Sequence, residues 1–150
     1  MLTNIWQKEI CLLYQGKYNL FNREPEEEGI LRQAKENGTG FIAFSPLAQG
    51  LLTNRYLNGI PEDSRMARGG FLKKEQLTED VLSKIKALNK MAEERGQTLA
   101  EMALAWVLKD DLVTSVIIGA SSVAQLEDNL KAIRNTSFTK EELRRLSLIH

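Results

Sequence analysis

The chain has 150 residues, of which 43% are hydrophobic and 27% charged, a balance that fits one soluble globular domain large enough to bury a core. Lys and Arg together number 20, as do Asp and Glu, so the formal net charge is zero. This balance argues against a general nucleic-acid or membrane-surface binder, because such proteins carry an excess of basic charge.

Targeting and redox signals in the sequence favour a cytoplasmic protein. The chain has one cysteine, Cys11, so a disulfide framework within it is impossible, and this residue is interpreted as a small buried hydrophobe. Residues 1–10 lack the basic start and long apolar stretch of a signal peptide. Apolar runs stay below the roughly 18 residues that a membrane span needs.

The first part of the chain predicts a strand, a helix and a second strand. Apolar runs cover residues 10–15 and 40–44, and the second stops abruptly at Ser45-Pro46. Between them, residues 26–37 place acidic groups in a first turn and apolar groups on one face, as in a helix. Neither run alternates cleanly between polar and apolar residues, which is typical of strands covered on both faces in a parallel sheet.

Residues 45–78 show no strong hydrophobic period and contain Pro46, Gly50 and Gly59 among other turn-forming residues. A loop of this length inside a compact domain is usually functional or disordered. The segment is therefore predicted to be an irregular connection with a possible role in binding.

The second half of the chain predicts helices around a third strand. A helical period covers 79–95, further helices start near 98, 122 and 139, and the apolar run 114–119 reads as a strand. Capping-box spacing supports three of the helix starts: Thr98 with Glu101, Ser122 with Gln125, and Thr139 with Glu142. The resulting order, β-α-β-loop-α-α-β-α-α, predicts right-handed units and a parallel sheet.

A polar cluster follows each predicted strand, over residues 15–19, 45–56 and 119–122. Since ligands gather at the carboxyl ends of parallel strands, the three clusters predict one ligand site. In the third cluster, Gly119 permits close approach to the backbone, and the free amides of the following helix favour a phosphate.

From residue type alone, each of these residues also has a purely structural interpretation. Ser122 and Gln125 would also serve merely to cap a helix, and Phe44 would also serve as a core residue. Arg55 and Arg65 would also serve as solvated surface groups. The coincidence of these signals at one sheet edge favours a binding site.

Three segments then carry a family resemblance. YQGKYNLFNRE, GFIAFSPLAQGLLTNRYLNGIPEDSR and VTSVIIGASSVAQLEDNL resemble, in order and spacing, the carboxyl-terminal half of the aldo/keto reductases. They are most similar to the branch that holds potassium-channel β-subunits and bacterial glyceraldehyde-3-phosphate reductases. The resemblance implies a (β/α)₈ barrel that binds NADPH and reduces aldehydes or ketones. It also implies that residues 1–150 form one partial domain, an incomplete barrel with the last three strands.

The resemblance assigns cofactor contacts to individual residues. Gln15 would bind the nicotinamide carboxamide, and Phe44 would stack on the nicotinamide ring. The pyrophosphate would lie along Ser45, Pro46, Leu47, Ala48 and Gly50, with Arg55 near it. Arg65 would approach the adenosine phosphate. The 2′-phosphate and adenine would be held by Gly119, Ser121, Gln125, Asp128 and Asn129.

Two departures from the family pattern shape the expected function. Many relatives place a basic residue where this chain has Ala120, so preference for NADP over NAD is left to Arg65, Ser121 and Gln125. The family's proton-donating tyrosine and its Asp, Lys and His partners lie on early strands that have no counterpart here. The one histidine is His150, the last residue. We therefore expect no catalytic residue and no metal ligand in this chain.

Two functions are expected from this combination. A (β/α)₈ barrel needs roughly 200 residues, and three βα units leave two strand edges open. The chain is therefore either the cofactor-binding half of an NADPH-dependent reductase, pairing with a missing amino-terminal half, or an inactive half-barrel that self-associates. A carbonyl substrate is expected only in a complete barrel, and the sequence does not specify which carbonyl.

Overall fold

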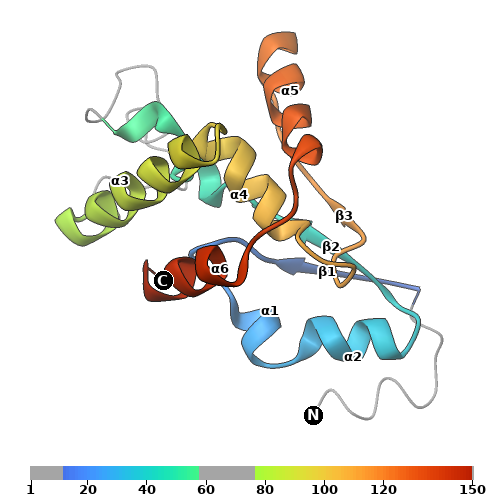
Figure 1. Cartoon of the computed structure of the whole chain (residues 1–150). Helices are drawn as coiled ribbons and strands as arrows, with labels where there is room; N and C mark the ends of the chain where they lie inside the picture. The colour runs from blue at the N-terminus through green and yellow to red at the C-terminus, as the bar shows by residue number, and fades with distance from the viewer. Residues whose placement is uncertain (1–11, 58–76, 150) are drawn as a thin grey trace.

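The computed structural model of the chain describes residues 12–57 and 77–149 (Figure 1). Cys11 and Arg65, on which sequence-based predictions were made, lie outside these residues. In chain order the elements are β1 (Leu13–Lys17), α1 (Glu24–Glu27), α2 (Ile30–Glu36), β2 (Gly40–Phe44), α3 (Glu79–Glu94), α4 (Leu99–Val107), β3 (Ser115–Val116), α5 (Val123–Leu130) and α6 (Lys140–Ile149). Short 3₁₀ helices cover η2 (Ala48–Gly50), η3 (Asn54–Tyr56) and η5 (Lys131–Arg134).

The strands form a parallel sheet in the order β1-β2-β3, which confirms the predicted α/β class. β2 has the predicted bounds, whereas β1 runs to Lys17 and β3 is only two residues long. Backbone bonds from Thr114 N to Phe41 O and from Ile117 N to Ala43 O, both 2.8 Å, continue the pairing beyond the bounds of β3. The described residues therefore make an open three-stranded sheet, a partial barrel.

The two faces of this sheet differ in burial. On one face, Gly16, Phe41 and Ala43 are buried against the helices, and a Cβ on Gly16 would lie 2.7 Å from the Phe41 ring. On the other face, Leu13 is 58% and Ile117 49% exposed. The prediction that both faces are covered is thus wrong for the described residues. The apolar residues on the open face explain why the strands read as doubly buried in sequence.

The predicted helix over 26–37 is divided into α1 and α2. Gly29 stands between them with φ of +76°, a left-handed conformation that interrupts the helical hydrogen bonds. Glycine adopts this conformation without a Cβ clash, so it permits the bend at low cost. Leu31 and Ala34 of α2 are then buried, and α2 packs along β2.

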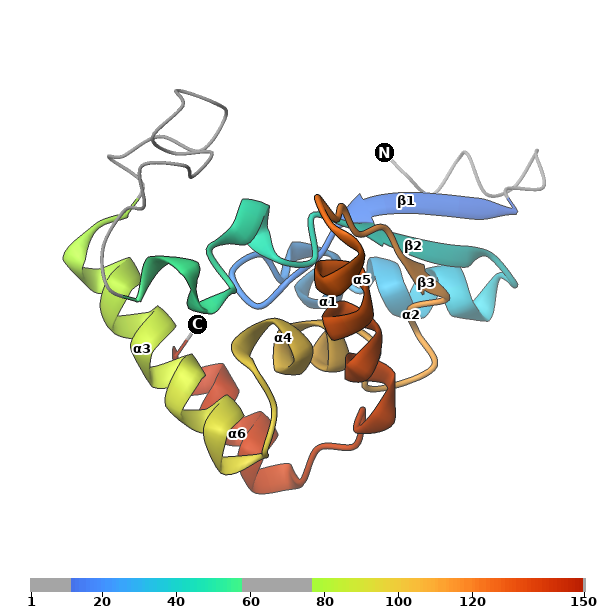
Figure 2. The same ribbon diagram turned by 90° about the horizontal axis from the view of Figure 1, so that it is seen from above.

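Helix α4 forms the centre of the hydrophobic core. All its residues except Ala100 are buried, and Figure 2 shows it with α3 and α6 on one side and α5 on the other. The Trp106 ring lies 5.0 Å from the Tyr18 ring, measured between centroids, and cations of Arg23 and Lys109 lie over it at 5.2 and 4.2 Å. This aromatic cluster joins α4 to the end of β1.

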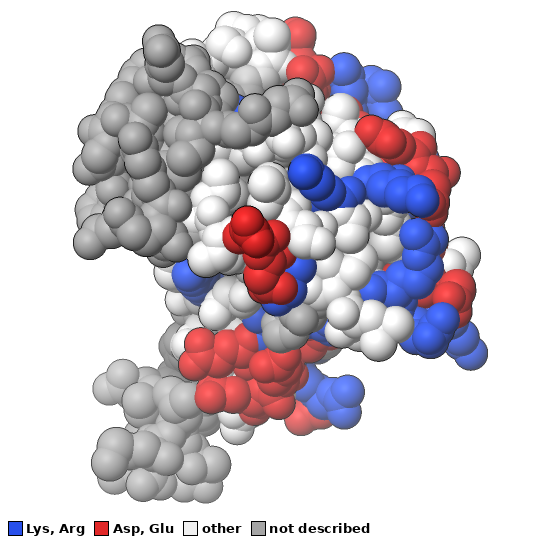
Figure 3. Space-filling model, turned by 90° about the vertical axis from the view of Figure 1, so that its left-hand side faces the viewer, with Lys and Arg blue, Asp and Glu red and all other residues white. Residues whose placement is uncertain are grey.

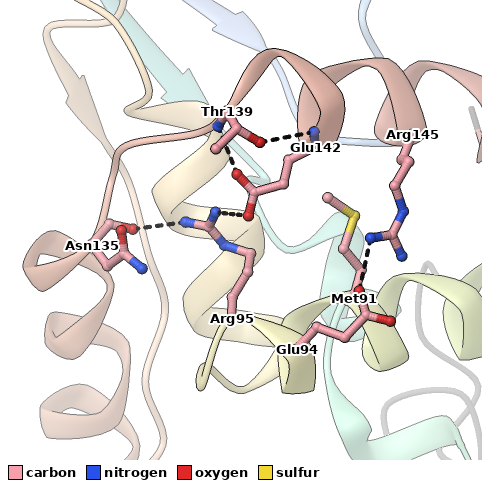
Figure 4. Close-up of a pocket in the computed structure, with 7 residues that line it drawn as sticks. All are labelled: Met91, Glu94, Arg95, Asn135, Thr139, Glu142 and Arg145. Atoms are coloured by element: carbon pink, nitrogen blue, oxygen red, sulfur yellow. Dashed lines mark hydrogen bonds and ion pairs between the residues drawn. The ribbon is translucent and has the colours of Figure 1, made fainter.

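Two of the three predicted capping boxes form as expected. Thr98 and Glu101 exchange hydrogen bonds at the start of α4, and Thr139 and Glu142 do so at the start of α6. Arg95, at the end of α3, adds an ion pair with Glu142 that ties α3 to α6 (Figure 4). Partial burial raises the pKa of the Glu142 carboxyl, but hydrogen bonds from Thr139 and Arg95 outweigh it, so the pKa lies below its usual range.

Charged side chains on the surface are mixed in sign. Figure 3 shows basic and acidic groups close together over much of one face. Examples of such pairing are Lys84 with Asp80 at 3.1 Å and Arg145 with Glu94 at 2.7 Å. Over the residues that the structure covers, the helices are too short or too polar to cross a bilayer.

Candidate functional site

A cavity of about 440 Å³ lies where the chain leaves β2 and β3. One wall is the loop after β2, and the other is the turn between β3 and α5. Both segments follow the carboxyl ends of parallel strands, the position at which α/β sheets bind ligands. The lining residues are Ser45, Pro46, Leu47, Gln49, Gly50, Thr53, Arg55, Tyr56, Ile117, Ile118, Gly119, Ser121 and Gln125.

The loop after β2 has an unusual backbone. Within the described residues, the non-glycine positions with positive φ are Ser45, Ala48 and Gln49, at +52°, +47° and +59°. Gly50 follows at +101°. Left-handed conformations of this kind cost about 1–3 kcal/mol each and cluster at ligand-binding sites. This loop is therefore the part of the described chain where backbone strain marks a site.

Local hydrogen bonds hold the loop in shape. Ala48 N donates to Ser45 O at 3.0 Å, and Gly50 N donates to Leu47 O at 2.8 Å. The Thr53 hydroxyl donates to Gly50 O at 2.7 Å and accepts from Arg55 N at 3.3 Å. These bonds fold the loop into two overlapping turns, and residues of both turns line the cavity.

The opposite wall is the amino-terminal end of α5. Ser122 caps the helix by accepting from Gln125 N at 3.2 Å, as predicted. The side-chain oxygen of Gln125, Oε1, accepts from Ser121 N at 2.8 Å and from Ser121 Oγ at 3.0 Å, instead of from Ser122 N. The predicted capping box is thus half formed, because the Gln125 side chain bonds to the residue before the N-cap and not to the N-cap residue Ser122. Because of this shift, Gln125 and Ser121 lie together at the cavity.

The electrostatics of the cavity favour an anion. Among the described residues that line it, Arg55 alone carries a formal charge, and this residue is exposed. Hydroxyls of Ser45, Thr53 and Ser121 also line the cavity. The α5 amino terminus adds the positive end of the helix dipole. This combination would suit an anionic group such as a phosphate.

Most residues predicted for the site are brought together by the fold. Eight of them line the cavity: Ser45, Pro46, Leu47, Gly50, Arg55, Gly119, Ser121 and Gln125. Ala48 belongs to the same loop but packs against the hydrophobic core. Gln15 and Phe44 lie on neighbouring strands and on the same open face of the sheet, since Gln15 pairs with Ile42 and Lys17 with Phe44. That face leads to the carboxyl ends of the strands.

Two predicted residues are placed apart from the cavity lining. Asp128 is exposed and pairs with Lys131 at 2.6 Å. Asn129 is 5% exposed, and its buried Nδ2 has no acceptor in the described residues. Their predicted contacts with an adenine stay untested predictions, as does the contact of Arg65, which lies outside the described residues.

Five lining residues were not assigned a cofactor contact from sequence. Gln49, Thr53 and Tyr56 lie in the predicted loop, and Ile117 and Ile118 end the predicted third strand. Gln49 could not be found from residue type, because its left-handed backbone is visible only in the structure. The isoleucines read as core in sequence, yet Ile117 is half exposed because the sheet is open beside it.

A second hollow, of about 360 Å³, lies between α3 and α6 (Figure 4). Its charges are paired with one another: Arg95 with Glu142, and Arg145 with Glu94. Arg95 also donates to the carbonyls of Asn135 and Ser137. Because these groups already satisfy each other, the hollow is interpreted as a helix-packing contact.

A buried tyrosine and lysine form a pair that resembles acid–base machinery. Lys109 Nζ donates to Tyr18 Oη at 2.9 Å, and Tyr18 Oη donates to Glu26 at 3.1 Å. Burial raises the pKa of Tyr18 and lowers the pKa of Lys109. Neither Tyr18 nor Lys109 belongs to the described residues that line the cavity, so the pair is interpreted as structural. Clusters of three or more His, Cys, Asp or Glu that could bind a metal do not occur in residues 12–57 and 77–149.

Comparison with known proteins identifies relatives. The aldo/keto reductase family profile matches residues 7–149. The chain is 54% identical over 136 residues to the L-glyceraldehyde 3-phosphate reductase of Escherichia coli O157:H7, covering 88% of this chain and 39% of that protein. It is 40% identical over 125 residues to a probable voltage-gated potassium channel subunit beta of Arabidopsis thaliana, covering 81% and 38%.

Solved structures give the same picture of the fold. The holo form of aldo-keto reductase AKR11C1 from Bacillus halodurans superimposes with a TM-score of 0.73 at 24% identity, over 99% of this chain and 46% of that one. The chain thus spans about two fifths of the length of the curated relatives it matches.

Proposed function

The chain belongs to the aldo/keto reductase family, and we propose that it forms the cofactor-binding part of an NADPH-dependent carbonyl reductase. In this proposal it supplies the carboxyl-terminal part of a (β/α)₈ barrel, and residues 1–150 make up one partial domain. The observation that carries the proposal is the cavity shared by the strained loop after β2 and the amino-terminal end of α5.

In this proposal each wall of the cavity binds a different part of the cofactor. The turns from Ser45 to Gly50 bring backbone close to a pyrophosphate, and Arg55 supplies a positive charge beside it. Gly119, Ser121 and Gln125 would hold the adenosine end with its 2′-phosphate. Gln15 and Phe44, on the open sheet face, would fix the carboxamide and face of the nicotinamide. The strained backbone agrees with a loop shaped for a ligand.

The chemistry that the nicotinamide supplies when bound is hydride donation to a carbonyl carbon. In this proposal the residues of this chain orient the ring and the phosphates, which reduces the entropic cost of reaching a reactive geometry. Protonation of the carbonyl oxygen is assigned to residues on a complementary amino-terminal part. We also propose a cytoplasmic location, where a soluble carbonyl substrate would be met.

A titration of the purified chain with NADPH tests the cofactor assignment. We expect saturable binding, weaker binding of NADH, and a roughly tenfold loss of NADPH affinity in Gln125→Ala, which removes a polar group at the 2′-phosphate end. Ser83→Ala is a matched surface control, since Ser83 is exposed on α3. Failure to bind either nucleotide would contradict the proposal, as would binding that Gln125→Ala leaves unchanged.

A reconstitution assay tests the enzymatic part of the proposal. We expect the chain alone to oxidise NADPH negligibly in the presence of L-glyceraldehyde 3-phosphate, and activity to appear when an amino-terminal reductase half is added. This aldehyde is chosen because the Escherichia coli relative is named for it. If a pair that forms a stable complex still fails to oxidise NADPH with this or other aldehydes, the enzymatic reading is wrong.

A second candidate function is an inactive half-barrel that self-associates. Exposed apolar side chains favour it: Leu12, just before β1, is 73% exposed. A further apolar stripe runs along α5 and η5, formed by Val123, Leu126, Leu130 and Ile133. Exposed patches of this kind usually mark an interface. Sedimentation of the chain over a range of concentrations separates the two functions, because self-association predicts a concentration-dependent oligomer and no activity with any partner half.

A further inference from the structure

The end of β1 is connected to the strained loop by a side chain. The last backbone hydrogen bond between these segments joins Tyr18 N to Phe44 O at 3.4 Å. Asn19 then turns away and pairs with Asn22, through backbone bonds of 3.1 and 3.0 Å. Its Nδ2 nevertheless donates to Ser45 O at 2.9 Å, across 26 residues of sequence. The side chain thus supplies the next connection after the backbone pairing ends.

The Asn19 amide is held firmly at its other end. Its Oδ1 accepts from Phe21 N and from Asn22 N, each at 2.9 Å. The residue is only 1% exposed, so these bonds form in a nearly dry environment. A buried amide with both ends hydrogen-bonded has little freedom to move, because every alternative rotamer would leave polar groups unpaired.

The residue that Asn19 holds is the first residue of the strained loop. Ser45 has a φ of +52°, and its carbonyl also accepts from Ala48 N at 3.0 Å. A serine keeps a left-handed conformation only where its surroundings over-determine it. The bond from Asn19 is one of the contacts that do so, since it fixes the direction of the Ser45 carbonyl.

We propose that Asn19 is a positioning residue for the dinucleotide, an inference that rests on the proposed function. Asn19 does not belong to the described residues that line the cavity. It acts through Ser45, by holding the loop in the conformation that accepts a pyrophosphate before any ligand arrives. Such pre-organisation raises affinity because the loop need not be ordered on binding.

The variant Asn19→Asp isolates the proposed contact. Ionised aspartate has the same shape and keeps an oxygen to accept from Phe21 N and Asn22 N, but it has no donor for the Ser45 carbonyl. By hydrogen–deuterium exchange without ligand, we expect the Ala48 and Gly50 amides to exchange roughly fivefold faster, the effect of losing one hydrogen bond, while α4 amides are unchanged. Equal loop exchange in the variant and the unchanged protein would overturn the proposal.

The matched control is Asn22→Ala, which removes an amide side chain from the same turn. The Oδ1 of Asn22 is buried and accepts no hydrogen bond in the described residues. We therefore expect loop exchange to remain at the level of the unchanged protein. A loop that loosens equally in Asn22→Ala would show that any damage to the turn has this effect, which would also overturn a specific role for Asn19.

NADPH affinity provides the functional readout, measured at a temperature at which melting curves show each variant to be folded. We expect Asn19→Asp to weaken binding roughly fivefold and Asn22→Ala to leave it unchanged. Unchanged affinity in Asn19→Asp would overturn the inference and leave the cofactor proposal standing. Absence of binding by the unchanged protein would defeat the cofactor proposal, and the exchange experiment would still decide whether Asn19 holds the loop.

A measurement on the unchanged protein covers the case in which Asn19→Asp fails to fold. By NMR, the Asn19 side-chain amide protons should exchange with solvent far more slowly than those of Asn54, which is exposed. They should also shift when NADPH is added, because the loop that they hold meets the ligand. Exchange as fast as that of Asn54 would overturn the proposal.

Discussion

The loop after β2 and the layer of helices α3, α4 and α6 are held in place by opposite means. In the loop, Ser45 and Gln49 adopt left-handed backbone conformations that cost energy, and a single buried amide, Asn19, connects the first of them to β1. In the helical layer, capping boxes satisfy the starts of α4 and α6, and nearly all of α4 is buried. The loop after β2 has a strained backbone, and the packing of the helical layer stabilises the fold in spite of that strain.

This difference separates stability from binding within one small chain. The helical layer contains much of the hydrophobic core, including Trp106, Met91 and Leu146. The cavity loop is rich in turns, and its residues from Ser45 to Gly50 are half-buried except for Pro46, which is buried. Binding regions of this kind are drawn from the less stable parts of a fold. Substitutions in the two regions should therefore affect different measurements.

The largest effect is expected from Trp106→Ala, which removes the centre of the helical layer. Loss of a fully buried aromatic side chain typically costs about 3–5 kcal/mol of unfolding free energy. Urea unfolding followed by circular dichroism measures this loss. Lys86→Ala, on the exposed face of α3, is the control and should leave the midpoint unchanged. A small loss in Trp106→Ala would mean that the core does not depend on α4.

The sharpest contrast comes from the same substitution made in both regions. Ala87→Gly, at an exposed position inside α3, should lower the unfolding free energy by about 1 kcal/mol, the difference in helix propensity. Ala48→Gly should leave it unchanged or raise it by up to about 1 kcal/mol, because glycine adopts a φ of +47° without strain. Equal losses in the two urea unfolding curves would show that the loop is not strained.

A pH series tests the contact between α3 and α6. Hydrogen bonds from Thr139 and Arg95 hold the pKa of Glu142 below its usual range, despite the opposing effect of partial burial. A lowered pKa contributes stability above the unfolded value, near about 4.3, and this stability disappears as pH falls through the folded pKa. Glu142→Gln should therefore lower stability at pH 7 and flatten its decline below about pH 4.5. An unaltered acid limb would contradict this assignment.

The smallest effect is expected from Asp128→Asn on α5. The ion pair with Lys131 is exposed, and surface pairs of this kind contribute little, so the urea midpoint should not change. NADPH affinity should fall less than in Gln125→Ala, because Asp128 lies outside the cavity lining. A larger fall than in Gln125→Ala would show that the family resemblance, and not the cavity, identifies the adenine contacts.

The end of β2 and the starts of α3, α4, α5 and α6 could be located from sequence because their signals are local. Ser45-Pro46 marks the end of β2, and Thr98 with Glu101 marks the start of α4. Residue types near those points, such as Gly119 and Ser121, then indicated where a ligand would meet the backbone. The break at Gly29 was missed because glycine is compatible with both a continuous helix and a turn until packing selects one.

By itself, the sequence determined the parallel α/β class and the polar clusters that follow the strands, because these follow from short-range periodicity and turn chemistry, whereas the individual cofactor contacts were predicted from the family resemblance. Only the tertiary structure showed that one sheet face is open, that Gln49 has a left-handed backbone, and that Asn19 reaches the carbonyl of Ser45. These three features depend on which segments meet in space. Contacts across 26 residues leave no periodic signal in a single sequence, so only the folded chain reveals them.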